Sequence, residues 1–168
     1  MSCNTLQDAL SSELILNARD ITTVKQLLDN GADINYQSTD GWCLLFELIS
    51  INAYKSIELL RPHRFNIHLK DAKGRSSLFW AIHYKHKAVI QVLLTMGLDL
   101  QENISDELPS LHYAVYKKSA DIVHLLLDTG ANIEATDIYG HTALDYAIMY
   151  ENEAMKTLLT SRGAVLSL

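Results

Sequence analysis

The feature that most constrains this chain is a period of 33 residues that runs through nearly its whole length. The segments CLLFELI, SSLFWAI, PSLHYAV and TALDYAI begin at positions 43, 76, 109 and 142, and each carries leucine at its third position. A second ladder of leucines follows the same spacing: Leu27, Leu60, Leu93, Leu126 and Leu159. An uninterrupted period of this length predicts similar structural units that stack on one another.

The period divides the chain into five units, 5–37, 38–70, 71–103, 104–136 and 137–168, which we interpret as one domain spanning 1–168. The composition, 48% hydrophobic and 20% charged, is typical of a globular protein. Each unit is too small to bury its own apolar face. We therefore expect one continuous core whose stability comes from contacts between neighbouring units.

Each unit contains two segments with helical spacing. The first follows a glycine-containing turn (TDGW, AKGR or IYGH) and is represented by Leu78, Ala81 and Ile82, at i, i+3 and i+4. The second carries the leucine ladder. Its predicted N-caps, whose side-chain oxygens can accept hydrogen bonds from free backbone N–H groups, are Asp20, Ser119 and Asn152.

A glycine follows the second segment in most units, where a helix C-terminus favours the left-handed conformation. The glycines share the 33-residue spacing, and Arg64 fills the one remaining slot: Gly31, Gly97, Gly130 and Gly163. We therefore predict that every second helix ends at this slot.

These segments resemble the ankyrin repeat, whose pattern is DxxGxTPLHxAxxxGxxxVxxLLxxGADxN. The best matches are LLDNGADIN at 27–35, LHYA at 111–114, LLLDTGANIE at 125–134 and GHTALDYA at 140–147. The resemblance implies an all-α solenoid of helix-turn-helix units with short β-turn fingers. It also implies a protein–protein interaction module with no chemistry of its own, since this fold serves many different partners.

Two segments depart from the repeat pattern. RPHRFNIH at 61–68 replaces the usual Gly-Ala-Asp segment and places Arg64 in the glycine slot. SDELPS at 105–110 has Glu107 in place of the turn glycine, so we expect the turn before Pro109 to differ from the others.

The stretch SSLFWAIHYKH at 76–86 carries an aromatic face beside its aliphatic one. Trp80, His83 and Tyr84 lie at i, i+3 and i+4. The same three slots in four units give twelve positions, of which six are aromatic, in a chain that is 8% aromatic. Because the aliphatic face must be buried, we expect the aromatic face to be exposed. The resemblance implies that it lines the concave groove.

Tyrosine and tryptophan are enriched at binding hot spots, so we predict that this face anchors an apolar segment of a partner protein. Residues at the turn tips extend the predicted surface. The predicted partner-binding residues are Trp42, Arg75, Trp80, His83, Tyr84, Leu108, Tyr113, Tyr116, Tyr139, His141, Tyr146, Met149 and Tyr150. An alternative remains, in which the aromatic residues stack on one another and only stabilise the solenoid.

The sequence offers little for catalysis or metal binding, and we predict neither an enzyme nor a cofactor. Phosphate-binding GxxxxGK[ST] and GxGxxG loops are absent. His83 and His86 have no Cys, Asp or Glu nearby to complete a zinc site, and His141 with Asp145 has no adjacent nucleophile. An enzyme or metal protein that uses His83, His86 and His141 is kept as an alternative.

Charge and cysteine content limit the classes of binding partner and the cell compartments that we expect. A formal net charge of -6 disfavours nucleic acid, and no apolar run approaches the roughly 18 residues of a membrane span. Two cysteines outside any CxxC pair favour a reducing, cytoplasmic interior, with a non-classical secretion route left open. A host-directed effector of an intracellular bacterium and a housekeeping scaffold both fit these features.

The two terminal units differ in polarity. In the first unit, Ser11, Ser12, Glu13 and Asn17 predict a polar outer face, as a terminal repeat requires. The last unit ends in GAVLSL, which we expect either to pack on the last helix pair or to meet a partner. A monomer is the expected state, and self-association through residues 164–168 is the alternative.

Overall fold

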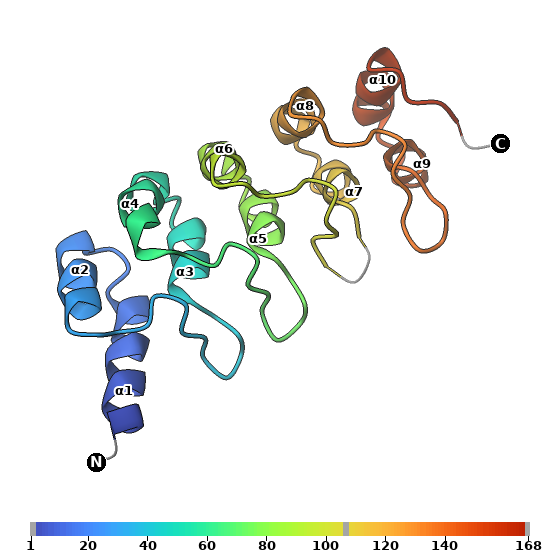
Figure 1. Ribbon diagram of the computed structural model, residues 1–168. Coiled ribbons are helices and arrows are strands. Elements are labelled where there is room, and N and C mark those ends of the chain that lie inside the picture. The colour runs from blue at the N-terminus through green and yellow to red at the C-terminus, as the bar shows by residue number, and fades with distance from the viewer. Residues whose placement is uncertain (1–2, 106–107, 167–168) are drawn as a thin grey trace.

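The computed structural model describes residues 3–105 and 108–166 of this chain, and the described part is all-α, as predicted. Figure 1 shows the helices in two parallel rows, with odd-numbered helices in one row, even-numbered helices in the other, and hairpin-like fingers projecting beyond the odd-numbered row. The helices are α1 (Cys3–Leu16), α2 (Ile21–Asp29), α3 (Leu44–Ser50), α4 (Tyr54–Leu60), α5 (Ser77–His83), α6 (Lys87–Thr95), α7 (Ser110–Tyr116), α8 (Ala120–Asp128), α9 (Ala143–Met149) and α10 (Glu153–Ser161), with a 3-10 turn η1 (Arg61–His63) after α4.

The core runs through the stack without interruption. Each odd-numbered helix contacts the next one along its row, and α4 contacts α6, which contacts α8. All four leucines of the first ladder are buried: Leu45, Leu78, Leu111 and Leu144. The second ladder is buried from Leu60 to Leu159, while Leu27 is half-buried. Stacking therefore supplies the apolar contacts that a single unit lacks. The placement of the unit boundaries stays a prediction.

Two of the three predicted N-caps are confirmed. The Asp20 carboxylate accepts hydrogen bonds from the N–H groups of Thr22 and Thr23, and the Asn152 side chain accepts one from Met155. Ser119 stands at the N-cap of α8, but its side chain makes no capping bond, so that part of the prediction is wrong.

The glycines after the second helices adopt φ between 92° and 100°, as predicted. Arg64 adopts a left-handed φ of 63° in the same slot, which the sequence analysis did not predict. The sequence analysis missed a second series of left-handed residues directly after the first helices. These residues have φ between 50° and 59° and are Asn52, Lys85, Lys118 and Glu151. No glycine marks them, so glycine spacing alone could not reveal them.

The fingers close in two different ways. Isolated bridges join residues six positions apart in three fingers: Gln37–Cys43, Lys70–Ser76 and Thr136–Thr142. In the remaining finger the bridge joins Ser105 and Leu108, as expected for an altered turn, although Glu107 itself lies outside the described residues.

An aspartate at the base of a finger organises two of the regular turns. Asp71 Oδ1 accepts the N–H groups of Lys73 and Arg75, and the equivalent Asp137 accepts those of Tyr139 and His141. The equivalent position in the altered finger is Ile104, which cannot accept such bonds. This substitution gives a physical reason for the different closure.

The first unit corrects one expectation. α1 has 14 residues, whereas the other odd-numbered helices have seven. Ser11 is buried and does not lie on the polar outer face. Its Oγ accepts the N–H of Asp33 at 2.9 Å and donates to the Gln7 carbonyl at 2.7 Å. A buried hydroxyl needs such partners, and the sequence pattern did not reveal them.

At the C-terminal end, residues 164–166 pack on the domain only in part. Ala164 is buried, whereas Val165 and Leu166 are 64% and 60% exposed. The Val165 N–H donates to Glu134 Oε1 at 3.1 Å. Among the described residues, no helix is long and apolar enough to cross a membrane.

Candidate binding surface

A continuous row of ring contacts crosses four units along the odd-numbered helices. Its consecutive members, which we call the aromatic row, are Trp42, Trp80, Phe79, Tyr113, Tyr116, Tyr150 and Tyr146. Centroid distances between neighbours run from 4.5 Å for Phe79–Tyr113 to 6.0 Å, within the range of favourable aromatic pairs. The predicted aromatic slots therefore do meet one another across the repeats.

The first half of the row is covered by its neighbours: Trp80 is buried and Trp42 is half-buried. Trp80 is only 8% exposed, because it lies edge-on to Trp42 at 4.9 Å and beneath the Arg75 guanidinium, 4.2 Å from its ring centroid. Asp71 holds Arg75 there through a 2.7 Å contact from Nε to Oδ2. The Trp42 indole N–H donates to Glu47 Oε2 at 2.9 Å. The expectation that the aromatic face is exposed is therefore wrong at Trp80, whereas Tyr84 on the same face is 38% exposed.

Tyr113 is also 8% exposed, and its hydroxyl lies 2.8 Å from Nδ1 of His83. Partial burial, together with the charges of Lys117 and Arg75, holds the pKa of His83 below its ordinary value. Burial raises the pKa of Tyr113. Both groups are therefore neutral near pH 7, and the contact is a hydrogen bond between uncharged partners.

The second half of the row is open. Leu108, Tyr113, Tyr116, Tyr146 and Tyr150 line one shallow hollow of about 230 Å³, which we call the tyrosine hollow. Tyr116 and Tyr150 are 51% and 48% exposed at its sides. All five lining residues belong to the predicted set, and they come from the altered finger, α7, α9 and the C-cap of α9.

One wall of the tyrosine hollow is fixed by hydrogen bonding. The Tyr146 hydroxyl donates to Asp137 Oδ2 at 2.9 Å, and the same carboxylate lies 3.5 Å from Nδ1 of His141. Burial and the bond to Asp137 raise the pKa of Tyr146 to about 12. Tyr146 therefore stays a neutral donor with a fixed ring orientation.

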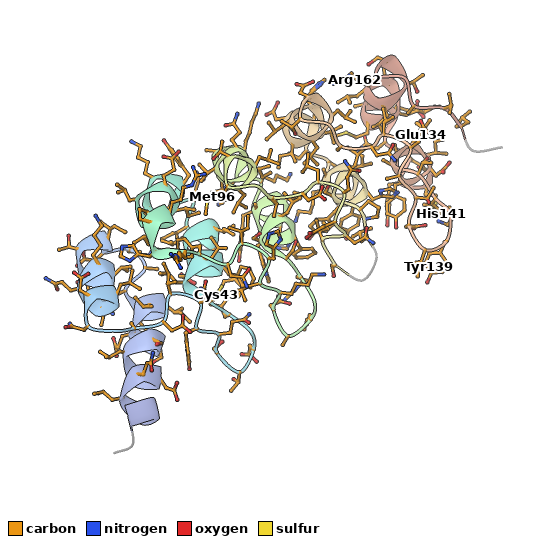
Figure 2. The ribbon with its side chains drawn as sticks, in the orientation of Figure 1. Cys43, Met96, Glu134, Tyr139, His141 and Arg162 are labelled. Carbon is orange, nitrogen blue, oxygen red and sulfur yellow. The ribbon has the colours of Figure 1, made fainter. Side chains whose placement is uncertain are left out.

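The remaining predicted residues lie around the row. Tyr139 is 77% exposed on the last finger, near His141 (Figure 2), and Met149 and Tyr84 are also exposed. Tyr139, Met149 and Tyr84 do not line the tyrosine hollow. The structure thus brings five of the predicted residues together, packs Trp42, Trp80, Arg75 and His83 behind them, and leaves Tyr139, His141, Met149 and Tyr84 at the periphery.

The sequence analysis missed Phe79, which joins the two halves of the row. Its ring stacks on Tyr113 at 4.5 Å and meets Trp80 edge-on at 5.4 Å. Phe46 occupies the same slot one unit earlier and packs 5.7 Å from Trp42. The available signal was positional, since both phenylalanines stand 33 residues apart in the slot where His112 stands one unit later.

The comparison with known families agrees with this architecture. A family model described as ankyrin repeats (3 copies) matches residues 13–104 and 97–167, which together cover most of the chain. The chain belongs to the ankyrin-repeat family.

Two curated relatives are similar to this ankyrin-repeat chain. A putative ankyrin repeat protein of Acanthamoeba polyphaga mimivirus is 31% identical over 157 residues, covering 90% of this chain and 20% of the relative. Serine/threonine-protein kinase 12 of Arabidopsis thaliana is 33% identical over 83 residues, covering 49% of this chain and 18% of that protein. The chain therefore spans about one fifth of the length of the curated relatives it matches.

Ankyrin-repeat domains are generally protein-binding and typically non-catalytic, and no catalytic domain is matched in this chain. In the described ranges, no group of three or more His, Cys, Asp or Glu side chains is placed to hold a metal ion. His83 contacts Tyr113, and His86 Nε2 lies 3.3 Å from the Ser50 carbonyl. Burial raises the pKa of the Cys43 thiol to about 11, which keeps it protonated and a poor nucleophile.

Proposed function

We propose that this ankyrin-repeat domain binds a partner protein by seating an apolar side chain of that partner in the tyrosine hollow. The observation that carries the proposal is the convergence of five predicted residues on one open hollow with Tyr116 and Tyr150 half-exposed at its sides. Tyrosine gives a large apolar contact area and a hydroxyl at its edge, so it anchors both apolar groups and backbone polar groups.

The buried half of the aromatic row supports this role by holding the hollow in shape. Tyr113 is fixed by Phe79 and His83, and Tyr146 is fixed by Asp137. Walls that are already ordered lose little conformational entropy when a partner binds, which favours affinity. Within the predicted set, we therefore assign direct contact to Tyr116 and Tyr150, and support to Trp80 and Tyr113.

The test compares three forms of the domain as affinity baits in lysate of the native cell. The first is wild type, and the second is Tyr116→Ala/Tyr150→Ala, which removes exposed rings with little effect on packing. The matched control is Leu16→Ala/Leu59→Ala, which removes two exposed apolar side chains far from the hollow. Any protein retained is then purified and titrated directly against all three forms by calorimetry.

We expect wild type and the leucine control to bind the purified protein equally, and the tyrosine variant to bind at least about tenfold more weakly, as for loss of hot-spot residues. Equal binding by all three forms, with unchanged helical circular dichroism, would overturn the proposal. In that case the aromatic row would only stabilise the solenoid.

A second candidate function is self-association at the C-terminal tail, which the exposure of Val165 and Leu166 favours. Sedimentation over a range of concentrations tests it. A mass that rises with concentration in wild type and stays constant after removal of 164–168 supports self-association, and a constant mass in both forms argues against it.

The host-directed bacterial role and the reducing compartment stay predictions. The two relatives come from a giant virus and a plant, so their sources give the bacterial role no support. Cys43 is a buried free thiol, which is compatible with a reducing interior.

A further inference from the structure

Positive charge is concentrated in the middle of the stack. Residues 48–98 hold eight of the 14 Lys and Arg residues but only two of the 20 Asp and Glu residues. The rest of the chain holds the other six basic and 18 acidic residues. Because the units stack in sequence order, residues 48–98 form the central section of the solenoid in Figure 1, with acidic sections on both sides.

Most of these basic groups are not neutralised by the protein itself. Of the eight Lys and Arg side chains in 48–98, only that of Arg75 lies within 4.0 Å of a carboxylate belonging to a described residue. Arg61 donates to the Thr95 carbonyl at 3.2 Å, and a carbonyl leaves its charge in place. The central section therefore presents a positive field between two acidic sections.

Part of this charge surrounds a hollow of about 280 Å³ that shares no residue with the tyrosine hollow. It lies between the segment after α4 and the end of α6, and it is lined by Arg61, Arg64 and His68 together with Phe65, Ile67 and Met96. Met96 marks the α6 side in Figure 2. No lining residue is acidic. Glu102 meets His68 at 3.5 Å and is the carboxylate found at the rim.

The three basic side chains are specific to this one step of the repeat. In the other units, Arg61 is replaced by Leu28, Leu94, Leu127 and Thr160, and Arg64 by Gly31, Gly97, Gly130 and Gly163. His68 is replaced by Asn35, Gln101 and Glu134. Among the described residues, no other unit has Arg, Lys or His at any of these slots, so the cluster is not a by-product of the repeat pattern.

Arg64 also occupies an unfavourable backbone conformation. Its φ is 63°, where a residue with a Cβ is less stable than glycine. Its backbone is hydrogen-bonded, since its N–H donates to the Arg61 carbonyl and its carbonyl accepts from the Asn35 side chain. Its guanidinium, in contrast, makes no hydrogen bond or ion pair with any described side chain. Lys85, Lys118 and Glu151 adopt similar left-handed conformations, so the feature that distinguishes Arg64 is its unpaired guanidinium and not its backbone.

We propose that the Arg61/Arg64/His68 hollow docks an acidic segment of a protein partner, with one carboxylate or phosphate group of that segment held by the two guanidinium groups. Arginine suits this role because its planar fork binds such oxyanions through paired hydrogen bonds. The remaining unpaired lysines of the central section attract the rest of the segment. The site needs a protein partner, as the proposed function does, but it does not need the tyrosine hollow.

The charge layout favours a short acidic segment over a nucleic acid. A nucleic-acid strand carries its charge along its whole length, so it would extend from the central section over the acidic sections on both sides. A peptide segment can end where the positive section ends. Nucleic-acid binding is therefore one of the outcomes that the experiment distinguishes.

The experiment measures fluorescence anisotropy of a short labelled peptide rich in glutamate, with a glutamine-rich peptide of the same length as the neutral comparison. The test variant is Arg61→Leu/Arg64→Gly, which installs residues that other units of this chain already use at these slots. The charge-matched control is Arg19→Gln/Lys25→Gln, which removes two exposed cations outside residues 48–98. Thermal melting of each form establishes that it is folded.

We expect the glutamate peptide to bind wild type and the charge-matched control, with affinity that falls as salt is raised, and to bind the Arg61→Leu/Arg64→Gly variant about tenfold more weakly. A phosphoserine-containing version of the peptide should follow the same order. The Tyr116→Ala/Tyr150→Ala variant should bind the glutamate peptide as wild type does, so failure of the tyrosine hollow and failure of this site are distinguishable.

Four results would overturn the proposal. These are equal loss in the charge-matched control, no loss in the arginine variant, tighter binding of a single-stranded oligonucleotide than of the peptide, and displacement of the peptide by inorganic phosphate at the same concentration. The first two would show no role for the hollow. The third would indicate a nucleic-acid partner, and the fourth a simple anion site.

Discussion

The two halves of the aromatic row share one repeat slot, which holds Trp80 in the first half and Tyr146 in the second, but the two halves have opposite environments. Around Trp80, the rings are covered by Trp42 and by Arg75, and successive fingers touch through the Ala72 N–H bond to the Asp40 carbonyl. Around Tyr150, the row borders an open hollow, and the last finger presents an exposed Tyr139.

This difference shows that an aromatic residue at a given position of the repeat does not by itself define a binding site. Its role depends on whether a neighbouring ring or finger covers it. At Trp80 the cover comes from one unit earlier, through Trp42, and from Arg75 within its own finger. At Tyr116 and Tyr150 no comparable cover is present among the described residues. The following experiments test whether the covered half stabilises the fold and the open half does not.

The largest effect is expected for Trp80→Ala, which should lower the free energy of unfolding by about 3–5 kcal/mol, because it leaves a cavity in a closely packed cluster. Chemical denaturation measures it. Tyr150→Ala is the comparison in the open half and should cost less than about 1 kcal/mol. Equal costs for the two variants would remove the distinction between the halves.

Contact between fingers gives the second test. An alanine Cβ at Gly41 would lie within 2.8 Å of three backbone atoms of Asp71 and Ala72, whereas one at Gly140 would meet nothing within 4 Å. Both glycines have left-handed φ, +73° and +82°, so both substitutions carry a similar backbone cost.

We expect Gly41→Ala to destabilise the domain by at least about 2 kcal/mol, because finger backbones must separate, and Gly140→Ala by about 1 kcal/mol. Thermal and chemical unfolding of both variants provide the measurement. A larger loss for Gly140→Ala would mean that the last finger is the more tightly constrained one.

Tyr146→Phe sharpens the comparison within the open half. It removes the hydrogen bond to Asp137 and should cost about 1 kcal/mol of unfolding free energy. Tyr116→Phe is the matched control, because the Tyr116 hydroxyl bonds to no described residue, and it should change stability by less than about 0.5 kcal/mol. If neither substitution changes the free energy of unfolding, Asp137 does not order the tyrosine hollow.

The smallest effect concerns pH. The folded-state pKa of His83 lies below its ordinary value of 6.5, mainly through burial, so below that pH the unfolded chain binds a proton that the folded chain excludes. Stability contributed by neutral His83 is therefore present above pH 6.5 and is lost as the pH falls from there toward the folded pKa.

His83→Gln should flatten this dependence in denaturation curves measured between about pH 7 and pH 5. His112, whose pKa burial also lowers, should leave a residual slope in the variant. An unchanged profile in His83→Gln would show that His83 contributes no pH-dependent stability.

Local sequence determined the helices and their ends to a large extent. The spacing of Leu78, Ala81 and Ile82 predicted α5, and the glycines of the 33-residue slot predicted the left-handed helix ends at their own positions. These features depend on residues within one or two helical turns, and periodicity reports them directly.

The exposure of Trp80 could not be predicted in the same way. Its contact with Trp42 joins residues from two different units, and Arg75 reaches it from the finger that precedes α5. Helical periodicity reports neither contact. The burial of Ser11 has the same cause, because its hydrogen-bond donor is Asp33, 22 residues away.

By itself, the sequence determined that this protein is a stack of ankyrin repeats, because the 33-residue period and its helix signals are local and repeated. Only the tertiary structure decided which side chains of the aromatic row are buried and which line a hollow. The physical reason is that burial is a property of neighbours brought together by stacking, and equivalent slots in a repeat have neighbours that differ from one unit to the next.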